Sequence, residues 1–276
     1  MMNSSGKKRN NRFTRLILLV VFAGIFLAGC AQETPPFSFV QLCDPQLGMG
    51  GYEHDKAALR QAVKQVNELD CDFAVVCGDL VHHAADSSFR DFLDIIGECE
   101  VPCYFVPGNH DVGREPTEER LAWYRQVIGE DYYSFDHKGF RFIAVNSPLW
   151  KSPLEEETGK HDRWFENLLE ETERQRIVVV GHYPLFIKDP GEEENYSNLS
   201  VSKRTALLDL FADHDVEAYL TGHRHETLLN EYQGIQLVTG ETTSKNFDDR
   251  PLGFRLWSAS PDTLTHRFVK LQPFEY

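Results

Sequence analysis

The sequence lacks the cysteine pattern of a disulfide-rich or zinc-ribbon protein. It contains six cysteines in 276 residues, and none of them forms a Cys-x-x-Cys pair, so neither a disulfide framework nor a cysteine zinc site is indicated. Cys30 stands alone near the N-terminus, which leaves five others, an odd number. Cys99 and Cys103 could form one disulfide, and the sequence does not decide whether they do. Cys43 and Cys77 each end an apolar run, and we expect both to be buried.

The sequence also lacks an apolar run long enough to cross a bilayer. The run at residues 16–27 is shorter than the roughly 20 apolar residues that a spanning helix needs. Five basic side chains precede it and small residues follow it, which is typical of a signal peptide over residues 1–29. The basic residues are Lys7, Lys8, Arg9, Arg12 and Arg15.

The end of this leader, Leu27-Ala28-Gly29-Cys30, resembles the bacterial lipobox, in which a peptidase cuts before the cysteine and acyl chains are added to it. The resemblance implies lipidation of Cys30, a short tether over residues 30–36, and an extracytoplasmic protein anchored to a bacterial membrane. Ala31 and Gln32 carry no acidic sorting signal, which favours the outer membrane where one exists. The alternative is an ordinary secretory leader in which Cys30 is incidental.

Positive charge is scarce as well. With 28 Lys and Arg against 43 Asp and Glu, the formal charge is −15, and removal of the five basic leader residues makes it −20. Such a surface repels polyanions, which argues against nucleic acid as a partner. A metal cluster can still make one cleft positive on an acidic protein.

Residues 37–276 are predicted to form one α/β domain. The chain is 41% hydrophobic, which is enough to bury one large core. Strands at 37–43, 73–77 and 103–106 alternate with helices at 55–69 and 87–98, and this order predicts a mainly parallel sheet. Further strands are expected at 132–135, 140–145, 176–181, 217–221, 226–231, 234–238, 253–257 and 263–269, with helices near 118–128, 161–174 and 203–213. The close spacing after residue 225 predicts a second, more antiparallel sheet.

Polar clusters follow five of the predicted strands. In open α/β sheets, ligands bind beyond the carboxyl ends of the strands, so loops that are distant in sequence would meet there. One such cluster alone would be weak evidence, because a single His or Asp usually has a structural role. Five together indicate a site for divalent metals, which prefer oxygen and imidazole donors. The clusters are Asp44-Pro45-Gln46, Gly78-Asp79, Gly108-Asn109-His110-Asp111, Gly181-His182 and Gly222-His223-Arg224-His225.

On these residues the sequence resembles the calcineurin-like metallophosphoesterases. That family carries Asp-x-His, Gly-Asp, Gly-Asn-His-Asp/Glu, Gly-His and Gly-His-x-His in this order, and four of the five motifs are intact here. The resemblance implies a four-layer α/β/β/α sandwich, in which helices flank two mixed sheets. It also implies two divalent or mixed-valence metal ions, commonly iron, manganese or zinc, at the sheet ends.

Carried over by position, the family's ligands fall into two sets that share Asp79. The resemblance implies that the first ion is held by Asp44, Gln46, Asp79 and His225, and the second by Asp79, Asn109, His182 and His223. His110 would be the catalytic residue beside the leaving-group oxygen. Its orienting partner is left open, with His82, Asp86 and Asp111 as candidates, because the Gly-Asp-x-Val-Asp-Arg-Gly string of many Ser/Thr protein phosphatases is absent.

Gln46 departs from the family pattern, which usually has histidine there. An amide oxygen is a weaker donor than imidazole, so metal affinity at the first site is in question. Asp-Pro-Gln is nevertheless similar to the form found in the calcineurin-like phosphoesterase domain-containing protein 1 branch. Strings similar to that branch also occur at residues 77–82, 181–186 and 195–199. Gln46 is therefore interpreted as a branch feature.

Several other residues are candidates for substrate contacts. Tyr183 and Arg224 lie beside expected ligands, although a surface salt bridge would equally explain Arg224. Asn195 and Tyr196 belong to a long irregular segment at 188–200, which is either a functional loop or a solvated acidic bulge.

The sequence predicts a dinuclear metal-dependent hydrolase of phosphate esters. Phosphomonoesters are favoured, and the branch resemblance implies phosphoserine or phosphothreonine in proteins. One alternative is a phosphodiesterase acting on nucleotides or lipid head groups. Another is a surface lipoprotein that binds a phosphorylated ligand without turnover, for which Gln46 is the one supporting feature. We expect a monomer that meets the membrane through its N-terminal lipid.

Overall fold

The computed structural model describes residues 35–173 and 175–276. The predicted signal peptide, Cys30 and most of the tether lie outside these residues. No helix in the described part of the chain combines the length and apolar character needed to span a membrane.

The first sheet contains five strands in the order β11-β10-β1-β2-β3. Strands β1 to β3 run parallel to one another, and β10 pairs antiparallel with both β1 and β11. Their bounds are β1 Phe37–Leu42, β2 Phe73–Val76, β3 Cys103–Phe105, β10 Gly253–Ala259 and β11 Leu264–Lys270. The middle strands β1 and β2 are apolar along nearly their whole length because both of their faces are covered.

The second sheet contains six strands in the order β4-β5-β6-β7-β9-β8. The central strands β5, β6, β7 and β9 are parallel, and each edge strand is antiparallel to its neighbour. Their bounds are β4 Tyr133–His137, β5 Phe140–Ala144, β6 Arg176–Val180, β7 Val216–Thr221, β8 Leu228–Tyr232 and β9 Ile235–Thr239.

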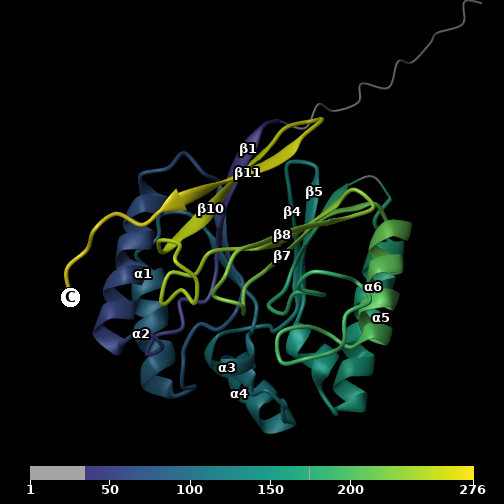
Figure 1. The fold of residues 1–276 in the computed structure, drawn as a ribbon, viewed down its shortest axis with the longest axis horizontal. Coiled ribbons are helices and arrows are strands. Elements are labelled where there is room, and N and C mark those ends of the chain that lie inside the picture. The colour runs from purple at the N-terminus through teal and green to yellow at the C-terminus, as the bar shows by residue number, and fades with distance from the viewer. Residues whose placement is uncertain (1–34, 174) are drawn as a thin grey trace, which may run out of the picture. The chain divides into compact units, whose positions relative to one another are not determined.

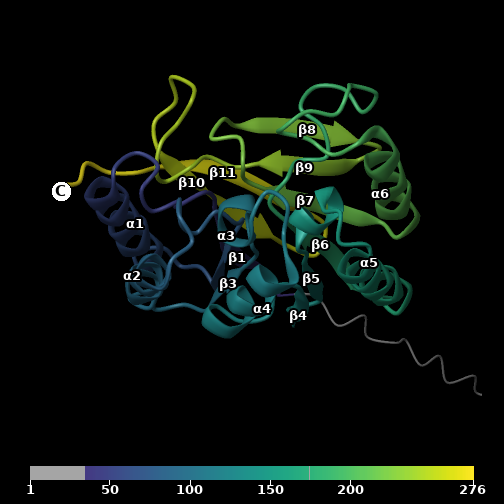
Figure 2. The ribbon, with the colours of Figure 1, turned by 90° about the horizontal axis from the view of Figure 1, so that it is seen from below.

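The two sheets pack face to face, and helices cover both outer faces (Figures 1 and 2). On the first sheet lie α1 Tyr52–Asn67 and α2 Asp86–Ile96, and on the second lie α5 Glu155–Glu170 and α6 Val201–Asp213. The predicted four-layer α/β/β/α sandwich with two mixed sheets is therefore confirmed. The short α3 Asn109–Val112 and α4 Glu118–Val127 follow β3 near the carboxyl ends of the strands.

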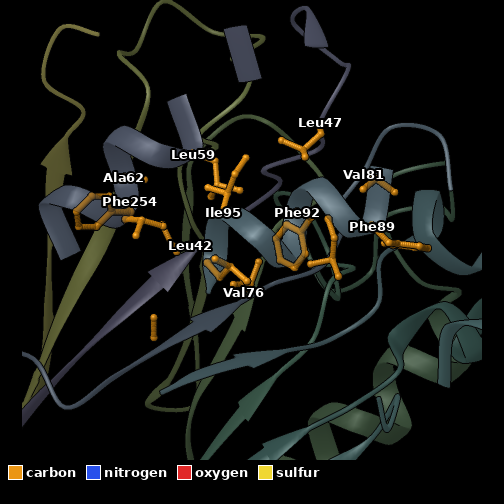
Figure 3. Packing of buried hydrophobic residues seen from close by; sticks show 14 of the residues in the cluster. Leu42, Leu47, Leu59, Ala62, Val76, Val81, Phe89, Phe92, Ile95 and Phe254 are labelled. Carbon is orange, nitrogen blue, oxygen red and sulfur yellow. The ribbon is translucent and has the colours of Figure 1, made fainter. Parts of the chain in front are cut away.

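The core is divided by the two sheets into three apolar layers. Between the sheets, Phe39 stacks on Phe73 and Trp257 at centroid distances of 5.1 and 5.7 Å, and Phe142 meets it edge-on at 5.1 Å. Outside the first sheet, buried side chains of α1 and α2 pack on β1 and β2 (Figure 3). A third cluster lies between the second sheet and α5 and α6. Each large apolar side chain buried in these layers contributes about 1.5–3 kcal/mol.

A second sheet is present as predicted, but it is mainly parallel and the strands after residue 225 do not form it by themselves. Strands β8 and β9 extend the sheet of β5 to β7, whereas β10 and β11 return to the first sheet beside β1. Helix α5 begins at Glu155, six residues earlier than predicted, because three glutamates in its first turn interact favourably with the positive end of the helix dipole. The sequence also gave no sign of α3 or of the 3₁₀ helix Ser147–Lys151.

Candidate metal centre

The predicted polar clusters all follow the carboxyl ends of strands that run parallel to a neighbour. Asp44 comes two residues after β1, Asp79 three residues after β2, and Asn109 opens α3 after β3. His182 and His223 each come two residues after their strands, β6 and β7. The backbone N–H of His223 donates to the Asp44 carboxylate at 2.8 Å, so the ends of the two sheets meet at one point.

The backbone is strained at this point. Five of the eight non-glycine residues with positive φ in the described part of the chain are predicted ligands: Asp44, Gln46, Asp79, His223 and His225. A left-handed conformation costs an ordinary L-residue about 1–2 kcal/mol. Such outliers gather where the surrounding structure forces side chains into a required position, which is common at functional sites.

Glycines allow these strained loops to approach one another closely. A Cβ atom on Gly108 would lie 2.1 Å from Asp79 Oδ1, and one on Gly222 would lie 2.5 Å from Asp44 Oδ2. Real Cβ contacts are essentially never this short. The glycines of the Gly-Asn-His-Asp and Gly-His-x-His motifs therefore leave the space that the two carboxylates occupy.

Two groups of buried donors share Asp79. In one group are Asp79, His182 and His223, and in the other are Asp44, Asp79 and His225, each with ligand atoms within 4.8 Å of one another. Asn109 adds its Oδ1 to the first group, 3.1 Å from His182 Nε2. This arrangement suits two cations that share a carboxylate.

Each of the three histidines has one ring nitrogen occupied by a main-chain carbonyl. Nδ1 of His182 meets the Cys77 carbonyl at 2.8 Å, and Nδ1 of His225 meets the Lys245 carbonyl at 2.6 Å. Nε2 of His223 meets the Tyr196 carbonyl at 3.3 Å. A carbonyl only accepts hydrogen bonds, so these nitrogens carry the protons. The opposite nitrogens keep their lone pairs for the centre, as is usual for metal-binding histidines.

The ring nitrogens and carboxylate oxygens that face the centre lack hydrogen-bond donors between them. His182 Nε2 lies 3.2 Å from His223 Nδ1 and 3.4 Å from Asp79 Oδ1, so lone pairs face one another. Burial alone would lower the pKa of His182, but Asp79 and Asp44 outweigh burial and raise it to about 9. Burial also raises the pKa of Asp44, although His225 and His182 oppose this. The site therefore attracts positive charge, which either a proton or a metal cation can supply.

Gln46 fits the centre although it replaces the expected histidine. The side chain is 2% exposed, its Nε2 donates to Asp79 Oδ2 at 3.3 Å, and its Oε1 has no hydrogen-bond partner. A buried amide oxygen without a partner costs about 1–3 kcal/mol. A cation at the first site would satisfy this oxygen, so the residues present fit a metal pair.

His110 lies beside the donor groups and is only partly buried. Its Nδ1 meets the main-chain carbonyl of His82 at 2.8 Å, and the His82 ring stacks on it at 4.9 Å. The orienting group is therefore a carbonyl of one of the three candidates rather than a side chain. Asp86 instead accepts from the Trp123 indole at 3.1 Å, and Asp111 accepts backbone N–H groups of residues 80, 81 and 108.

No sequence pattern predicted the residues that hold the main chain of Asp44 in place. The hydroxyls of Thr242 and Ser244 both donate to the main-chain carbonyl of Asp44, at 2.9 and 2.8 Å. These two residues follow β9, and they are fully buried or nearly so. Only the return of β9 beside β7 brings them to the centre, so no local pattern could have identified them.

The long segment at 188–200 reaches the centre through Tyr196. The Tyr196 ring packs on His223 at 4.8 Å, and Asn109 Nδ2 donates to its hydroxyl at 3.3 Å. Asn195 is exposed and caps a local turn by accepting from the Ser197 N–H at 2.8 Å. Of the two residues predicted from this loop, the structure thus brings Tyr196 to the donor groups and uses Asn195 for the turn.

Two cationic side chains hold this loop in place, and the sequence did not single out either. Arg204 is fully buried and donates to the carbonyls of Pro190, Glu192 and Leu199 at 2.6–2.9 Å. Lys151 donates to the carbonyl of Asn195 at 2.8 Å. The loop is therefore an ordered wall of the centre rather than a solvated bulge.

Tyr183 and Arg224 are engaged by other side chains of the protein. Tyr183 is fully buried, with its ring 4.3 Å from His223, so it packs behind that imidazole. The Arg224 guanidinium pairs with Glu226 and donates to the Ser197 hydroxyl at 2.8 Å. The salt-bridge alternative accounts for Arg224 in this structure.

None of the described cysteines forms a disulfide. Cys43 and Cys77 are fully buried as predicted, and Cys99 and Cys103 are free thiols.

Comparisons with known proteins agree with this geometry. Residues 37–227 match the family model described as calcineurin-like phosphoesterase. The chain is 32% identical over 263 residues to serine/threonine-protein phosphatase CPPED1 of Danio rerio, covering 86% of this chain and 85% of that protein. It is 23% identical over 257 residues to the 3',5'-cyclic adenosine monophosphate phosphodiesterase CpdA of Escherichia coli (strain K12), covering 89% of this chain and 86% of that protein.

The fold has a solved counterpart as well. The structure of a dimetal phosphatase from Danio rerio superposes with a TM-score of 0.68 at 15% identity, covering 87% of this chain and 98% of that one. The donor groups and these similarities make the protein a metal-dependent hydrolase of phosphate esters. The chain belongs to the calcineurin-like phosphoesterase family.

Proposed function

We propose that the protein hydrolyses phosphomonoesters with two cations bound at the shared aspartate. The observation that carries this proposal is the pair of buried donor groups that meet at Asp79. Asp44, Gln46, Asp79 and His225 would hold one ion, and Asp79, Asn109, His182 and His223 the other. Such a pair, when bound, supplies Lewis-acid activation of water and neutralises charge on the phosphoryl group. Iron, manganese and zinc all suit these oxygen and imidazole donors.

His110 supplies the proton in this proposal. The His82 carbonyl keeps a proton on Nδ1, so in the protonated ring Nε2 is free to donate. As a water oxygen forms its bond to phosphorus, the ester P–O bond breaks and the leaving alkoxide takes the Nε2 proton. The products are inorganic phosphate and an alcohol. A positioned general acid of this kind contributes roughly 10²–10⁴-fold to the rate.

The preference for monoesters is supported by similarity to proteins named serine/threonine-protein phosphatase CPPED1. The test is hydrolysis of p-nitrophenyl phosphate and of bis(p-nitrophenyl) phosphate by the full chain loaded with manganese or iron. We expect a higher kcat/KM for the monoester and its loss in Asp79→Asn. Equal, negligible turnover by the native chain and by Asp79→Asn would refute hydrolysis.

A phosphodiesterase is the second candidate, and the similarity to the E. coli cyclic nucleotide phosphodiesterase favours it. Diesters have a single negative charge on the phosphoryl group, and the same two cations could serve both reactions. A large preference for the bis-ester, or for 3',5'-cyclic AMP, would replace the monoester proposal.

We also propose that the protein is exported and anchored through a lipid on Cys30. The support is the leader sequence, which ends in Leu27-Ala28-Gly29-Cys30. Metabolic labelling with an alkyne fatty acid in a bacterial host should mark the native chain in the membrane fraction. Cys30→Ser should lose both the label and the membrane fraction. Unlabelled, soluble native protein would refute anchoring.

The direction of β1 bears on the substrate of an anchored protein. The strand begins at Phe37, near the start of the domain, and Asp44 follows its other end. Six residues of strand span about 20 Å, so the chain enters the domain at the end of β1 opposite the metal centre. This arrangement favours soluble phosphoesters over lipid head groups of the anchoring membrane.

A further inference from the structure

A cavity of about 410 Å³ opens beside His110. Its walls include Asn109 and His110 of α3, Arg114 from the turn after α3, Arg120 of α4, and Tyr196 from the long loop. The volume falls within the range of about 300–1,000 Å³ typical of small-molecule sites. His182, His223 and His225 do not line it. The cavity therefore adjoins the centre at Asn109 and His110.

The two arginines of this cavity are free to bind an anion. Both are exposed, and neither has a carboxylate within 4.0 Å among the described residues. Several other arginines of this acidic protein pair with carboxylates, as Arg125 does with Asp131 and Arg141 with Asp136. Arg114 is instead held over the ring of Tyr196 at 5.1 Å, a cation–π contact that fixes its position without using its hydrogen-bond donors.

The position of the cavity defines which part of a substrate would fill it. This step rests on the proposed function, in which His110 protonates the leaving alkoxide. The alcohol portion of the ester would then extend past His110 into the cavity, while the phosphoryl group lies at the donor groups. Arginine binds carboxylate and phosphate through a planar fork of N–H donors.

We propose that the cavity is a leaving-group subsite for a second anion. The preferred substrates are phosphomonoesters whose alcohol portion carries another phosphate or a carboxylate. Arg114 and Arg120 bind this second group, and hydrolysis releases inorganic phosphate and an anionic alcohol. A small bisphosphate and a phosphopeptide with an acidic neighbour both have this chemistry.

The first arm of the test uses small ligands. The kcat/KM of the metal-loaded full chain is compared for propane-1,3-diol monophosphate and its bisphosphate, with phosphate release as the readout. We expect at least a tenfold preference for the bisphosphate, or about 1.4 kcal/mol. Arg114→Met with Arg120→Met should bring the ratio of the two constants to near one. Arg90→Met is the matched control, because Arg90 is also exposed but lines a separate hollow.

The second arm uses a phosphoserine peptide with glutamate or glutamine as its neighbours, and identifies which source of the second anion is accepted. A preference in either arm that the double variant abolishes and Arg90→Met retains supports the subsite. Equal constants in both arms, with monoester hydrolysis intact, overturn it.

Binding gives a reading that does not depend on turnover. Calorimetry with the corresponding mono- and bisphosphonates should show the same tenfold ratio and the same loss in the double variant. If p-nitrophenyl phosphate is not hydrolysed, the proposed function fails, yet the binding ratio still decides whether the arginines form an anion subsite. Equal affinities for the two phosphonates would overturn the subsite in that case.

Discussion

Replacing Gly108 with alanine should disable the centre through a single methyl group. The new Cβ would lie 2.1 Å from Asp79 Oδ1 and 2.2 Å from the backbone N of Asp79, where ordinary contacts begin at 3.4 Å. Gly108 does not have positive φ, so the cost comes from the contact. Because a main-chain atom is involved, no rotamer change of Asp79 relieves it, and the backbones of residues 108 and 79 must move apart by about 1 Å.

Both donor groups contain Asp79, so this displacement disturbs both. A misplacement of about 1 Å can cost roughly 10²-fold in rate, which corresponds to about 2.7 kcal/mol of transition-state stabilisation. Overpacking should lower the free energy of unfolding by about 1–3 kcal/mol as well. The assays are kcat/KM for p-nitrophenyl phosphate, metal content of the purified protein, and urea unfolding.

Gly159→Ala is the matched control. Gly159 lies inside α5, where a Cβ would meet only the flexible end of Arg163 at 3.2 Å. Alanine in a helix interior should raise the free energy of unfolding by about 0.5–1 kcal/mol and leave kcat/KM unchanged. If Gly108→Ala binds metal and turns over like the native protein, the close approach of Gly108 to Asp79 does not shape the centre.

Three further predictions follow from the same structure. Arg204→Met removes the N–H groups that donate to three loop carbonyls, so it should lower the free energy of unfolding by about 3 kcal/mol and speed proteolysis of the loop at 188–200. Unchanged urea unfolding would contradict this role. Chelation of the metal ions should lower the Tm, because an ion present at 100 times its Kd stabilises the folded state by about 2.7 kcal/mol. Asp79→Asn should show no metal-dependent Tm shift, and a retained shift would mean that the ions bind elsewhere. Burial and the neighbouring Arg255 lower the pKa of His266 to about 4 in the folded protein. Between this value and the ordinary histidine pKa of about 6.5, His266 binds more protons in the unfolded chain than in the folded one. Stability should fall as the pH falls through this window, and His266→Gln should flatten that part of the profile measured by urea unfolding.

The sequence by itself determined most of the helices and strands and the residues that gather at the centre. Apolar runs such as 73–77 and the helical spacing at 55–69 are local patterns, and each predicted element between 37 and 145 appears in the structure near its expected bounds. The predicted ligands Asp44, Asp79, His182, His223 and His225 come together because parallel strands direct their carboxyl ends to one edge.

Only the tertiary structure decided which residues support that centre. Strand pairing after residue 225 depends on partners that can be more than 200 residues away, as when β10 returns to β1, and local spacing carries no information about such pairing. Thr242 and Ser244 reach Asp44 through such long-range contacts, and Arg114 meets Tyr196 across a distance of 82 residues in sequence. Tyr183 and Arg224 are sequence neighbours of the ligands, yet packing buries one and pairs the other. The sequence shows which loop carries a side chain. The direction in which that side chain points depends on the neighbours that the fold brings to it.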